Sequence, residues 1–241
     1  MEYDVVVIGG GPAGFVSAIM AKKLYKCNVL LIKKEEKFVI PCGIPYIFGT
    51  LQDVDKDCVP NKKLEDADVD VMIDEVLGID VESKIVRTRL KDIRYEKLIL
   101  ATGSLPWKPP IPGSDKKNVF SVHKSYEKLK SMLEVLKNSQ RIAIIGGGFI
   151  GVELADELIK SGKEVYLIEM LPHILQLYFD EEFYMPIENR MKEKGVKVYT
   201  STKVTEIKGD EYAKSIVLSN GEEIPIDAVV IATGTKPNVE L

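Results

Sequence analysis

Two glycine-rich hexapeptides and one cysteine are the residues of this sequence whose types and spacing suit them to chemistry. The first hexapeptide follows the apolar run 5–8 and opens a helical pattern over Pro12–Tyr25. Strand, glycine turn and helix in this order form the GxGxxG fingerprint of a dinucleotide-binding site. Its first glycine permits the turn, its second lets the backbone approach a pyrophosphate, and its third lets helix and strand pack closely. The candidate contact residues are Gly9, Gly11, Pro12, Ala13 and Gly14.

The second hexapeptide repeats this arrangement after the apolar strand Ile142–Ile145. Each copy is followed by a helix, a second apolar strand (Val29–Ile32 and Val165–Ile168), short strands, and a strand running into Ala-Thr-Gly. A single glycine turn without a ligand is common, but repetition of the whole module favours two nucleotide-binding units. The further candidate contacts are Gly146, Gly148, Phe149, Ile150 and Gly151 in the second turn, and Ala101, Thr102, Gly103 and Gly234 in the Ala-Thr-Gly segments.

The residue at the end of each second strand decides how an adenosine ribose is recognised. In the second unit this residue is Glu169, whose carboxylate accepts from ribose hydroxyls and repels a 2′-phosphate, so NADH is favoured over NADPH. In the first unit it is Lys33, which has only donors. Three alternatives stay open there: Glu35 reaches the ribose instead, Lys33 and Lys34 favour a ribose phosphate, or two exposed lysines simply end a strand.

Cys42 is the candidate catalytic residue. Prolines and a glycine beside it force turns, and residues 44–51 have the pattern of a short helix, whose dipole would stabilise a thiolate. The alternative is a small buried hydrophobe, which is a common role for cysteine. Cys27 and Cys58 have no such setting and are assigned structural or incidental roles. No cysteine stands four or five residues from Cys42, which excludes a local dithiol–disulfide pair.

Composition excludes several classes of function. The chain has 241 residues, 45% of them hydrophobic, and a net charge of −4. A net negative charge does not favour binding to nucleic acid or to an anionic membrane. No apolar run reaches transmembrane length, and a core strand begins too early for a signal peptide. Three cysteines do not make a disulfide framework, so a cytoplasmic location is expected. His123 and His173 lack metal-ligating companions in sequence, and no metal site is predicted.

The elements between these motifs follow from periodicity and from turn residues. Residues Asp70–Tyr95 alternate as three short strands, and the proline-rich stretch Ser104–Pro112 reads as a stiff connection between domains. Apolar spacing predicts a helix over Ser125–Lys137, an amphipathic helix is expected over Asp180–Lys194, and Lys62–Ala67 is expected to form a short helix. The sequence therefore predicts an α/β protein in which parallel strands alternate with helices.

Taken together, the two GxGxxG turns, the two Ala-Thr-Gly strands and the segment Pro-Cys-Gly-Ile-Pro-Tyr at 41–46 resemble the pyridine nucleotide–disulfide oxidoreductases. The resemblance is nearest to the single-cysteine branch, which contains CoA-disulfide reductases, NADH oxidases and peroxidases, and persulfide or sulfur reductases. It covers essentially the whole chain. It implies two Rossmann-like units of the glutathione-reductase type, each a parallel sheet with a small antiparallel β-meander. The first unit would bind FAD and the second NAD(H), with NADP(H) as the less favoured nucleotide.

The resemblance also implies roles for single residues and a division into domains. Backbone near Val76 would face the adenine, and Glu153, part of the family's pyridine-nucleotide motif, would be a polar anchor near the nicotinamide from the first helical turn. Phe149 stands where relatives often carry a tyrosine that gates the nicotinamide against the flavin. The implied domains are an FAD-binding domain at 1–112, an NAD(P)H-binding domain at 113–236, and at 237–241 the start of a segment returning to the FAD domain.

Three departures from the family pattern bear on function. Phe38 and Pro41 replace the Ser and Asn that usually precede the cysteine, which leaves the acceptor open. Lys33 replaces the ribose-binding acid. The sequence stops at Leu241, whereas relatives continue with a further flavin-domain segment and a dimerisation domain. We therefore expect a truncated form or a short homologue, and a homodimer for full-length relatives.

The expected reaction passes hydride from NADH through a flavin to a small-molecule disulfide, persulfide or CoA disulfide, with Cys42 as the single redox thiol. One alternative is a flavin NADH oxidase or peroxidase, or a reductase of an electron carrier, in which Cys42 is dispensable. Another is a truncated nucleotide-binding module without catalysis. With one thiol, Cys42 would have to cycle through a bond to substrate sulfur or to oxygen.

Overall fold

The computed structural model describes residues 2–241, which form two compact units. The first unit contains the residues up to Pro41, Cys58–Leu105 and Pro237–Leu241, and the second contains Cys42–Asp57 and Pro106–Lys236. The segment Cys42–Asp57, which carries the candidate thiol, thus clusters with the second unit, whereas the sequence-based division put it in the first. That division, at residues 112 and 236, stays a prediction about domains.

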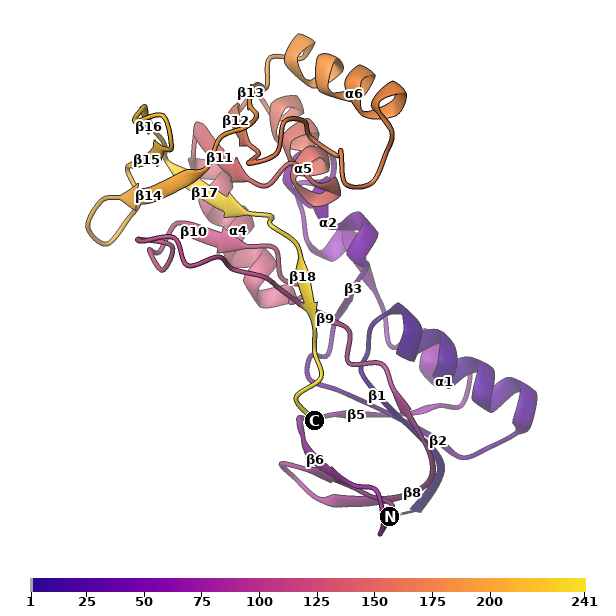
Figure 1. The fold of residues 1–241 in the computed structure, drawn as a ribbon. Helices are drawn as coiled ribbons and strands as arrows, with labels where there is room; N and C mark the ends of the chain where they lie inside the picture. The colour runs from indigo at the N-terminus through magenta and orange to yellow at the C-terminus, as the bar shows by residue number, and fades with distance from the viewer. Residues whose placement is uncertain (1) are drawn as a thin grey trace. The chain divides into compact units, whose positions relative to one another are not determined.

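The first unit is built on a six-stranded sheet of order β5, β2, β1, β8, β7, β6 (Figure 1). The neighbours from β5 to β8 are parallel, and β7 and β6 add an antiparallel meander. The prediction of three short strands over Asp70–Tyr95 needs a correction. This region contains β5, β6, β7 and the start of β8, and β5 belongs to the parallel part of the sheet. The strands are β1 (Glu2–Ile8), β2 (Val29–Lys33), β5 (Asp70–Ile73), β6 (Val76–Asp80), β7 (Ile85–Thr88) and β8 (Asp92–Leu100).

Alternation along β1 gives the first unit a core on each face of its sheet. Val5 and Val7 pack with Phe15 of the helix α1 (Pro12–Tyr25). Val6 and Ile8 face the opposite side, where Val86 and Ile93 of the meander are buried. The short helix α3 (Lys62–Glu65) adds Leu64 to the α1 side. This double-sided core holds the carboxyl end of β1, where the first glycine turn begins.

The second unit has a five-stranded parallel sheet of order β10, β17, β11, β12, β13. In Figure 1 the yellow β17 lies between the pink strands β10 and β11, as the register of the pairs requires. An antiparallel meander of three strands covers this sheet with apolar side chains. The strands are β10 (Val119–Ser121), β11 (Arg141–Ile145), β12 (Glu164–Ile168), β13 (Lys197–Tyr199), β14 (Val204–Lys208), β15 (Ser215–Leu218), β16 (Glu223–Pro225) and β17 (Ala228–Ile231).

Helices α4 (Tyr126–Asn138) and α6 (Glu181–Glu193) confirm the predicted helices to within a residue or two, and α5 (Phe149–Lys160) is the helix expected after the second glycine turn. Helix α4 buries the predicted apolar stripe, including Leu129, Met132 and Leu136. The segment after Cys42 is helical, as predicted, but it is not one regular helix. Cys42 itself lies in a 3-10 turn (Pro41–Gly43), which is followed by α2 (Ile44–Tyr46), the π-helical turn η2 (Ile47–Leu51) and the 3-10 turn η3 (Asp55–Asp57).

Short paired strands complete the fold. β3 (Phe38–Val39) pairs with β4 (Cys58–Val59) on either side of the thiol segment. β9 (Ser104–Pro106) pairs with β18 (Thr235–Pro237), so the two connecting stretches of the chain run side by side. Within residues 2–241, no helix combines the length and apolarity needed to cross a membrane. The predicted α/β fold with two Rossmann-like units, each with a meander, is confirmed.

Candidate nucleotide and thiol sites

Both glycine turns are closed by backbone-to-backbone contact. Gly9 and Gly146 have φ of 114° and 112°, and a Cβ on either would lie 2.1 Å from the carbonyl oxygen of Ala101 or 2.5 Å from that of Ala232. A Cβ on the last glycine of each motif would lie 1.9 Å from the carbonyl oxygen of the first. Left-handed φ and van der Waals overlap therefore both require glycine at the corner, and overlap alone requires it at Gly14 and Gly151.

The central glycines are different. Gly11 and Gly148 have ordinary φ of −74° and −78°, so their backbone does not require glycine. A Cβ on Gly11 would meet nothing within 4 Å, and one on Gly148 would meet only Tyr178 at 3.5 Å. The protein leaves space at both positions beside a helix N-terminus, and this fits the close approach of a pyrophosphate. The open space beside Gly11 and Gly148 thus supports dinucleotide binding at both turns, independently of the sequence motif.

The helices that follow start at the predicted positions. Pro12 is the first residue of α1, with Gly11 as N-cap, and Phe149 is the first residue of α5, with Gly148 as N-cap. Pro12 has no N–H, so Ala13 and Gly14 supply the free donors of the first turn, whereas Phe149 and Ile150 both supply one in the second. The dipole of each helix points its positive end at the cradle.

Glu169 lies directly after β12 and is almost fully buried. Its Oε2 accepts from the Gly147 amide at 2.6 Å, and its Oε1 accepts from the Leu171 amide at 2.8 Å. The carboxylate is therefore fixed against the glycine turn by two charge-assisted bonds. Each oxygen keeps a second lone pair, so the group can still accept from ribose hydroxyls.

At the corresponding place in the first unit, only one of the two lysines is exposed. The alternative that two exposed lysines simply end the strand is therefore wrong. Lys33 is 6% exposed, its Nζ donates to Glu36 O at 2.6 Å and Asn61 Oδ1 at 2.5 Å, and burial lowers its pKa. Lys34 is exposed and forms an ion pair with Glu75 at 2.5 Å. Glu35 is half-buried just beyond β2. The choice between Glu35 and the lysines as ribose contacts stays a prediction.

An aromatic cluster lies at the mouth of the second turn. The Phe149 ring is 4.6 Å from the Tyr178 ring and 5.5 Å, edge-on, from Phe179. The loop that carries these rings is fixed because the Leu175 amide donates to Gly147 O at 2.8 Å. Phe149 is 44% exposed, which suits the predicted gating position.

The prediction that Glu153 lies in the first turn of α5 is wrong. The helix starts at Phe149, which makes Glu153 its fifth residue. One helical turn thus separates it from the N-terminal donors. Partial burial raises the pKa of Glu153. Its role near a nicotinamide stays a prediction.

The Ala-Thr-Gly segments lie where the motif analysis expected them, at the carboxyl ends of β8 and β17. Ala101 N donates to Ile8 O at 2.8 Å, and Ala232 N donates to Ile145 O at 2.8 Å, which joins each segment to its glycine-turn strand. Gly103 and Gly234 have left-handed φ of 71° and 100°. Val76 is buried at the start of β6.

Cys42 lies in the turn that precedes α2, as predicted, and its side chain is exposed, whereas Cys27 and Cys58 are half-buried. The segment behind the thiol is anchored to the second unit. The buried Glu157 of α5 accepts from Thr50 N at 2.8 Å and from Thr50 Oγ1 at 2.7 Å. A Cβ on Gly49 would lie 2.3 Å from Glu157 O, so the π-turn and α5 are in direct contact.

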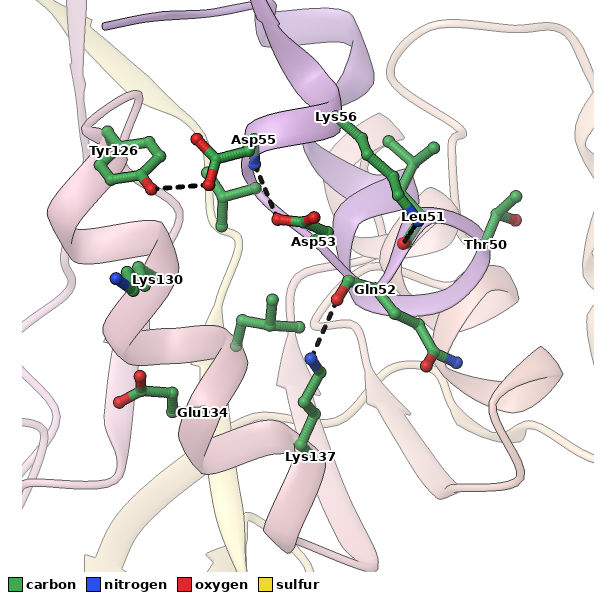
Figure 2. A pocket seen from close by; sticks show the side chains of 12 residues that line it. Thr50, Leu51, Gln52, Asp53, Asp55, Lys56, Tyr126, Lys130, Glu134 and Lys137 are labelled. Carbon is green, nitrogen blue, oxygen red and sulfur yellow. Dashed lines mark hydrogen bonds between the residues drawn. The ribbon is translucent and has the colours of Figure 1, made fainter. Parts of the chain in front are cut away.

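Helix α4 holds the other side of this segment around a cavity of about 570 Å³ (Figure 2). The Tyr126 hydroxyl donates to Asp55 Oδ2 at 3.0 Å, and Lys137 Nζ donates to Gln52 O at 2.9 Å. Figure 2 shows these two side chains reaching from α4 to Gln52 and Asp55. The cavity wall mixes acids and lysines, so it has no single charge that would select a ligand.

Sequence reasoning missed the anchors of both sites. No sequence motif marks Glu157, Tyr178 or Asp57, the last of which is a buried acid beside the turn that carries Cys42. A signal existed for Glu157 alone, which is a charged residue in the apolar stripe of a helix. His173 has a carboxylate partner after all: Glu188 Oε2 lies 3.2 Å from its Nδ1. In the described part of the chain, no three His, Cys, Asp or Glu residues gather as a metal site.

Comparison with known proteins gives consistent matches. A family model described as pyridine nucleotide-disulphide oxidoreductase matches residues 3–241. The chain is 30% identical to an NADH oxidase of Methanocaldococcus jannaschii, with 98% of this chain and 55% of the relative covered. It is 32% identical to a CoA-dependent NAD(P)H sulfur oxidoreductase of Pyrococcus abyssi, with 100% and 55% covered. The chain thus spans about half the length of these curated relatives.

A solved structure of an NAD-dependent persulfide reductase from A. fulgidus superposes with a TM-score of 0.88 at 33% identity. All of this chain and 47% of that one are covered. The similarity therefore extends over both units.

Proposed function

From the premise that this chain belongs to the pyridine nucleotide-disulphide oxidoreductase family, we propose that it is an FAD-dependent NADH oxidoreductase whose acceptor is a disulfide, persulfide or CoA disulfide. The observation that carries the proposal is the space that the protein leaves beside Gly11 and Gly148, combined with an exposed thiol at a helix start. The names of the sulfur and persulfide reductases among the relatives support the sulfur acceptor.

FAD and NAD(H) are the cofactors of this family. The first turn would hold FAD through the backbone at Gly9, Gly11, Ala13 and Gly14, with Val76 and the Ala101–Gly103 segment beside it. The second would hold NADH through the turn Gly146–Gly151, with Glu169 on the ribose. A bound flavin supplies an acceptor for hydride and a donor of electrons to sulfur.

Glu169 supports NADH as the preferred nucleotide. Its carboxylate is fixed by the Gly147 and Leu171 amides, so it cannot swing away from a 2′-phosphate without losing both hydrogen bonds. Phe149, Tyr178 and Phe179 would exclude water from the nicotinamide end with an apolar surface. Phe149 has no hydroxyl, so it would screen this end by stacking alone.

Cys42 would be the group that attacks the acceptor. The thiol is exposed, and the turn that carries it runs directly into the helical segment that starts at Ile44. Attack on a disulfide forms a mixed disulfide with Cys42 and releases the other sulfur as a thiol after protonation. Two electrons from NADH then cleave the S–S bond of the mixed disulfide, which returns Cys42 to the thiolate and releases the second acceptor sulfur as a thiol after protonation, so a second cysteine is unnecessary.

The test is Cys42→Ser in the chain supplied with FAD, with NADH consumption followed in the presence of CoA disulfide or polysulfide. We expect sulfur-dependent consumption to fall at least about a hundredfold, because hydroxyl cannot replace thiolate in the exchange. Cys27→Ser is the matched control and should keep the activity. Undiminished disulfide reduction in Cys42→Ser would remove Cys42 from the mechanism.

A second candidate is a flavin NADH oxidase in which Cys42 is dispensable, and the NADH oxidase relatives favour it. Oxygen uptake by the same variant separates the two: retained NADH-dependent uptake supports an oxidase. A third reading, a nucleotide-binding module without flavin, is excluded if the purified chain retains flavin absorbance. The wider proposals are a cytoplasmic location, a homodimer for the longer relatives, and the domain limits given above.

A further inference from the structure

Glu188 is a buried acid of the helix α6, and neither the sequence motifs nor the proposed function gives it a role. It is 2% exposed, although it lies in the middle of a helix with charged faces. Its Oε1 accepts from Lys192 Nζ at 2.6 Å, and its Oε2 accepts from the Ile174 amide at 3.2 Å. The same Oε2 lies 3.2 Å from His173 Nδ1. Acids are almost never buried without such partners, so these partners indicate what Glu188 is for.

The side chain of Glu188 is a carboxylate that binds a loop of the second unit. Burial alone would raise the pKa of this carboxyl group, but hydrogen bonds from Lys192, the Ile174 amide and His173 outweigh burial and lower the pKa. The bond to the Ile174 amide is therefore charge-assisted, which makes it stronger than a bond between neutral groups. Both partners of Oε2 belong to the loop 169–180, which joins β12 to α6.

Ile174 connects Glu188 to the second glycine turn. Its side chain is fully buried, and a Cβ on Gly147 would lie 2.8 Å from its Cγ2. The next residue, Leu175, donates its amide to Gly147 O at 2.8 Å and has a left-handed φ of 59°. A residue with a Cβ is uncommon in that conformation and persists only where its surroundings hold it. Glu188 thus holds one side of the loop, and Gly147 holds the other.

The same loop brings Tyr178 to the open space beside Gly148. The Tyr178 amide donates to Leu175 O at 2.9 Å, so the backbone of Tyr178 depends on the conformation of Leu175. A Cβ on Gly148 would lie 3.5 Å from the Tyr178 ring, which also packs 4.6 Å from the ring of Phe149. A displacement of the loop would therefore move this ring relative to the space proposed for the pyrophosphate of NADH.

We propose that Glu188 is a positioning residue for NADH binding, which acts by holding the loop 169–180 against the second glycine turn. The carboxylate acts through the Ile174 amide rather than on the nucleotide, and Ile174 and Leu175 in turn fix the loop on Gly147. A loop that is held in place before the nucleotide arrives loses less conformational freedom on binding, which increases affinity. The inference rests on the proposed NADH site of the second unit.

The first test is Glu188→Gln, which keeps the size of the side chain but removes the charge and one of the two acceptor oxygens. Calorimetric titration should give an NADH affinity about threefold to tenfold lower and an unchanged FAD affinity. Glu193→Gln removes an exposed charge from the same helix and is the matched control, which should change neither affinity. Unchanged NADH affinity in Glu188→Gln overturns the proposal, and so does an equal fall in both affinities, which would indicate a general loss of structure.

Amide hydrogen exchange tests the support of the loop without a nucleotide. In Glu188→Gln, the Leu175 amide should exchange at least about tenfold faster, because the loop has lost its support from α6. The Gly146 amide, which donates to Ile168 O at the corner of the turn, should keep its rate. An unchanged rate at Leu175 contradicts the proposal. Faster exchange at Leu175 in a chain that binds no NADH would refute the proposed function but not the support of the loop by Glu188.

The parent chain provides a test that holds even if Glu188→Gln fails to fold. Saturation with NAD⁺ should slow exchange of the Ile174 amide at least about threefold, because a nucleotide that prefers the held loop must stabilise the bond to Glu188 by the same coupling. Unchanged exchange at Ile174 with the nucleotide bound overturns the proposal.

Discussion

The turns at Gly9–Gly14 and Gly146–Gly151 have matching backbones and opposite charges beside them. Their corner glycines differ by 2° in φ, and the corner N–H donates to Ile32 O at 2.9 Å in one and to Ile168 O at 2.8 Å in the other. Beside the second turn, Glu169 accepts from the Gly147 amide. Beside the first, the methylene chain of Lys33 covers Gly10, within 2.6 Å of where a Cβ would stand.

This difference separates two tasks that the dinucleotide motif usually joins. The cradle for the pyrophosphate is made of backbone, so it survives in both units with different side chains around it. Recognition of the ribose depends on one side chain, which is an acceptor in one unit and a donor bound to Asn61 in the other. We therefore expect the two units to hold pyrophosphates alike and to recognise adenosine differently.

The largest expected effect tests the shared backbone. Gly14→Ala and Gly151→Ala should each destabilise the protein by about 2–3 kcal/mol, because the new Cβ would overlap a carbonyl oxygen and the helix would have to move. Urea unfolding measures this. Gly78→Ala is the matched control, since its Cβ would meet nothing within 4 Å. If all three variants unfold at one urea concentration, the close packing of both turns is wrong.

The central glycines should give the opposite result. Gly11→Ala and Gly148→Ala should change the stability by less than about 0.5 kcal/mol, since their backbone is ordinary and their surroundings open. They should weaken FAD or NADH binding, respectively, more than about tenfold, or about 1.4 kcal/mol, because a methyl group fills the cradle. Calorimetric titration with each nucleotide checks this. Full affinity in both variants would mean that the nucleotides bind elsewhere.

Charge beside the second turn is tested by Glu169→Gln. The amide retains one acceptor oxygen but loses the negative charge, so we expect NADH affinity to fall roughly tenfold and the preference for NADH over NADPH to shrink. Competition binding with the two nucleotides measures the ratio. Glu181→Gln, which removes a charge from an exposed helix turn, serves as the control. An unaltered ratio would show that Glu169 acts only on the Gly147 loop.

The smallest effect concerns Lys33 and pH. The folded protein lowers the pKa of Lys33 below its unfolded value near 10.4, so between the folded and the unfolded pKa the unfolded chain binds more protons, and stability rises with pH across that window. In Lys33→Met this small rise should be missing when unfolding is compared at pH 8 and pH 10.5. Lys34→Met, at an exposed position, should keep it. A parallel pH dependence in Lys33→Met would place the charge outside the buried environment.

Much of this protein could be predicted from its sequence because the signals are local. Glycine corners after apolar strands predicted both turns, alternation and helical spacing predicted the sheets and α4–α6, and flanking prolines predicted the helical segment after Cys42. Two local predictions were wrong. Glu153 lies just beyond the first turn of α5 rather than in it, and β5 belongs to the parallel sheet rather than to the meander. A chain fragment contains much of the information for such a turn, because the left-handed φ at its corner is a local property of glycine.

The surroundings of single side chains could not be predicted, because they depend on contacts between residues far apart in the chain. Thr50 and Glu157 are 107 residues apart, and no local pattern brings a hydroxyl of the thiol segment to an acid of α5. The same holds for Asp57 below Gly43, and for Lys33, which a surface pattern would leave in water. Local residue patterns were enough to locate the turns of the backbone and the apolar stripes of the helices and strands. Burial, charge pairing and the environment of the thiol depend on which elements pack together, and that is a property of the folded chain alone.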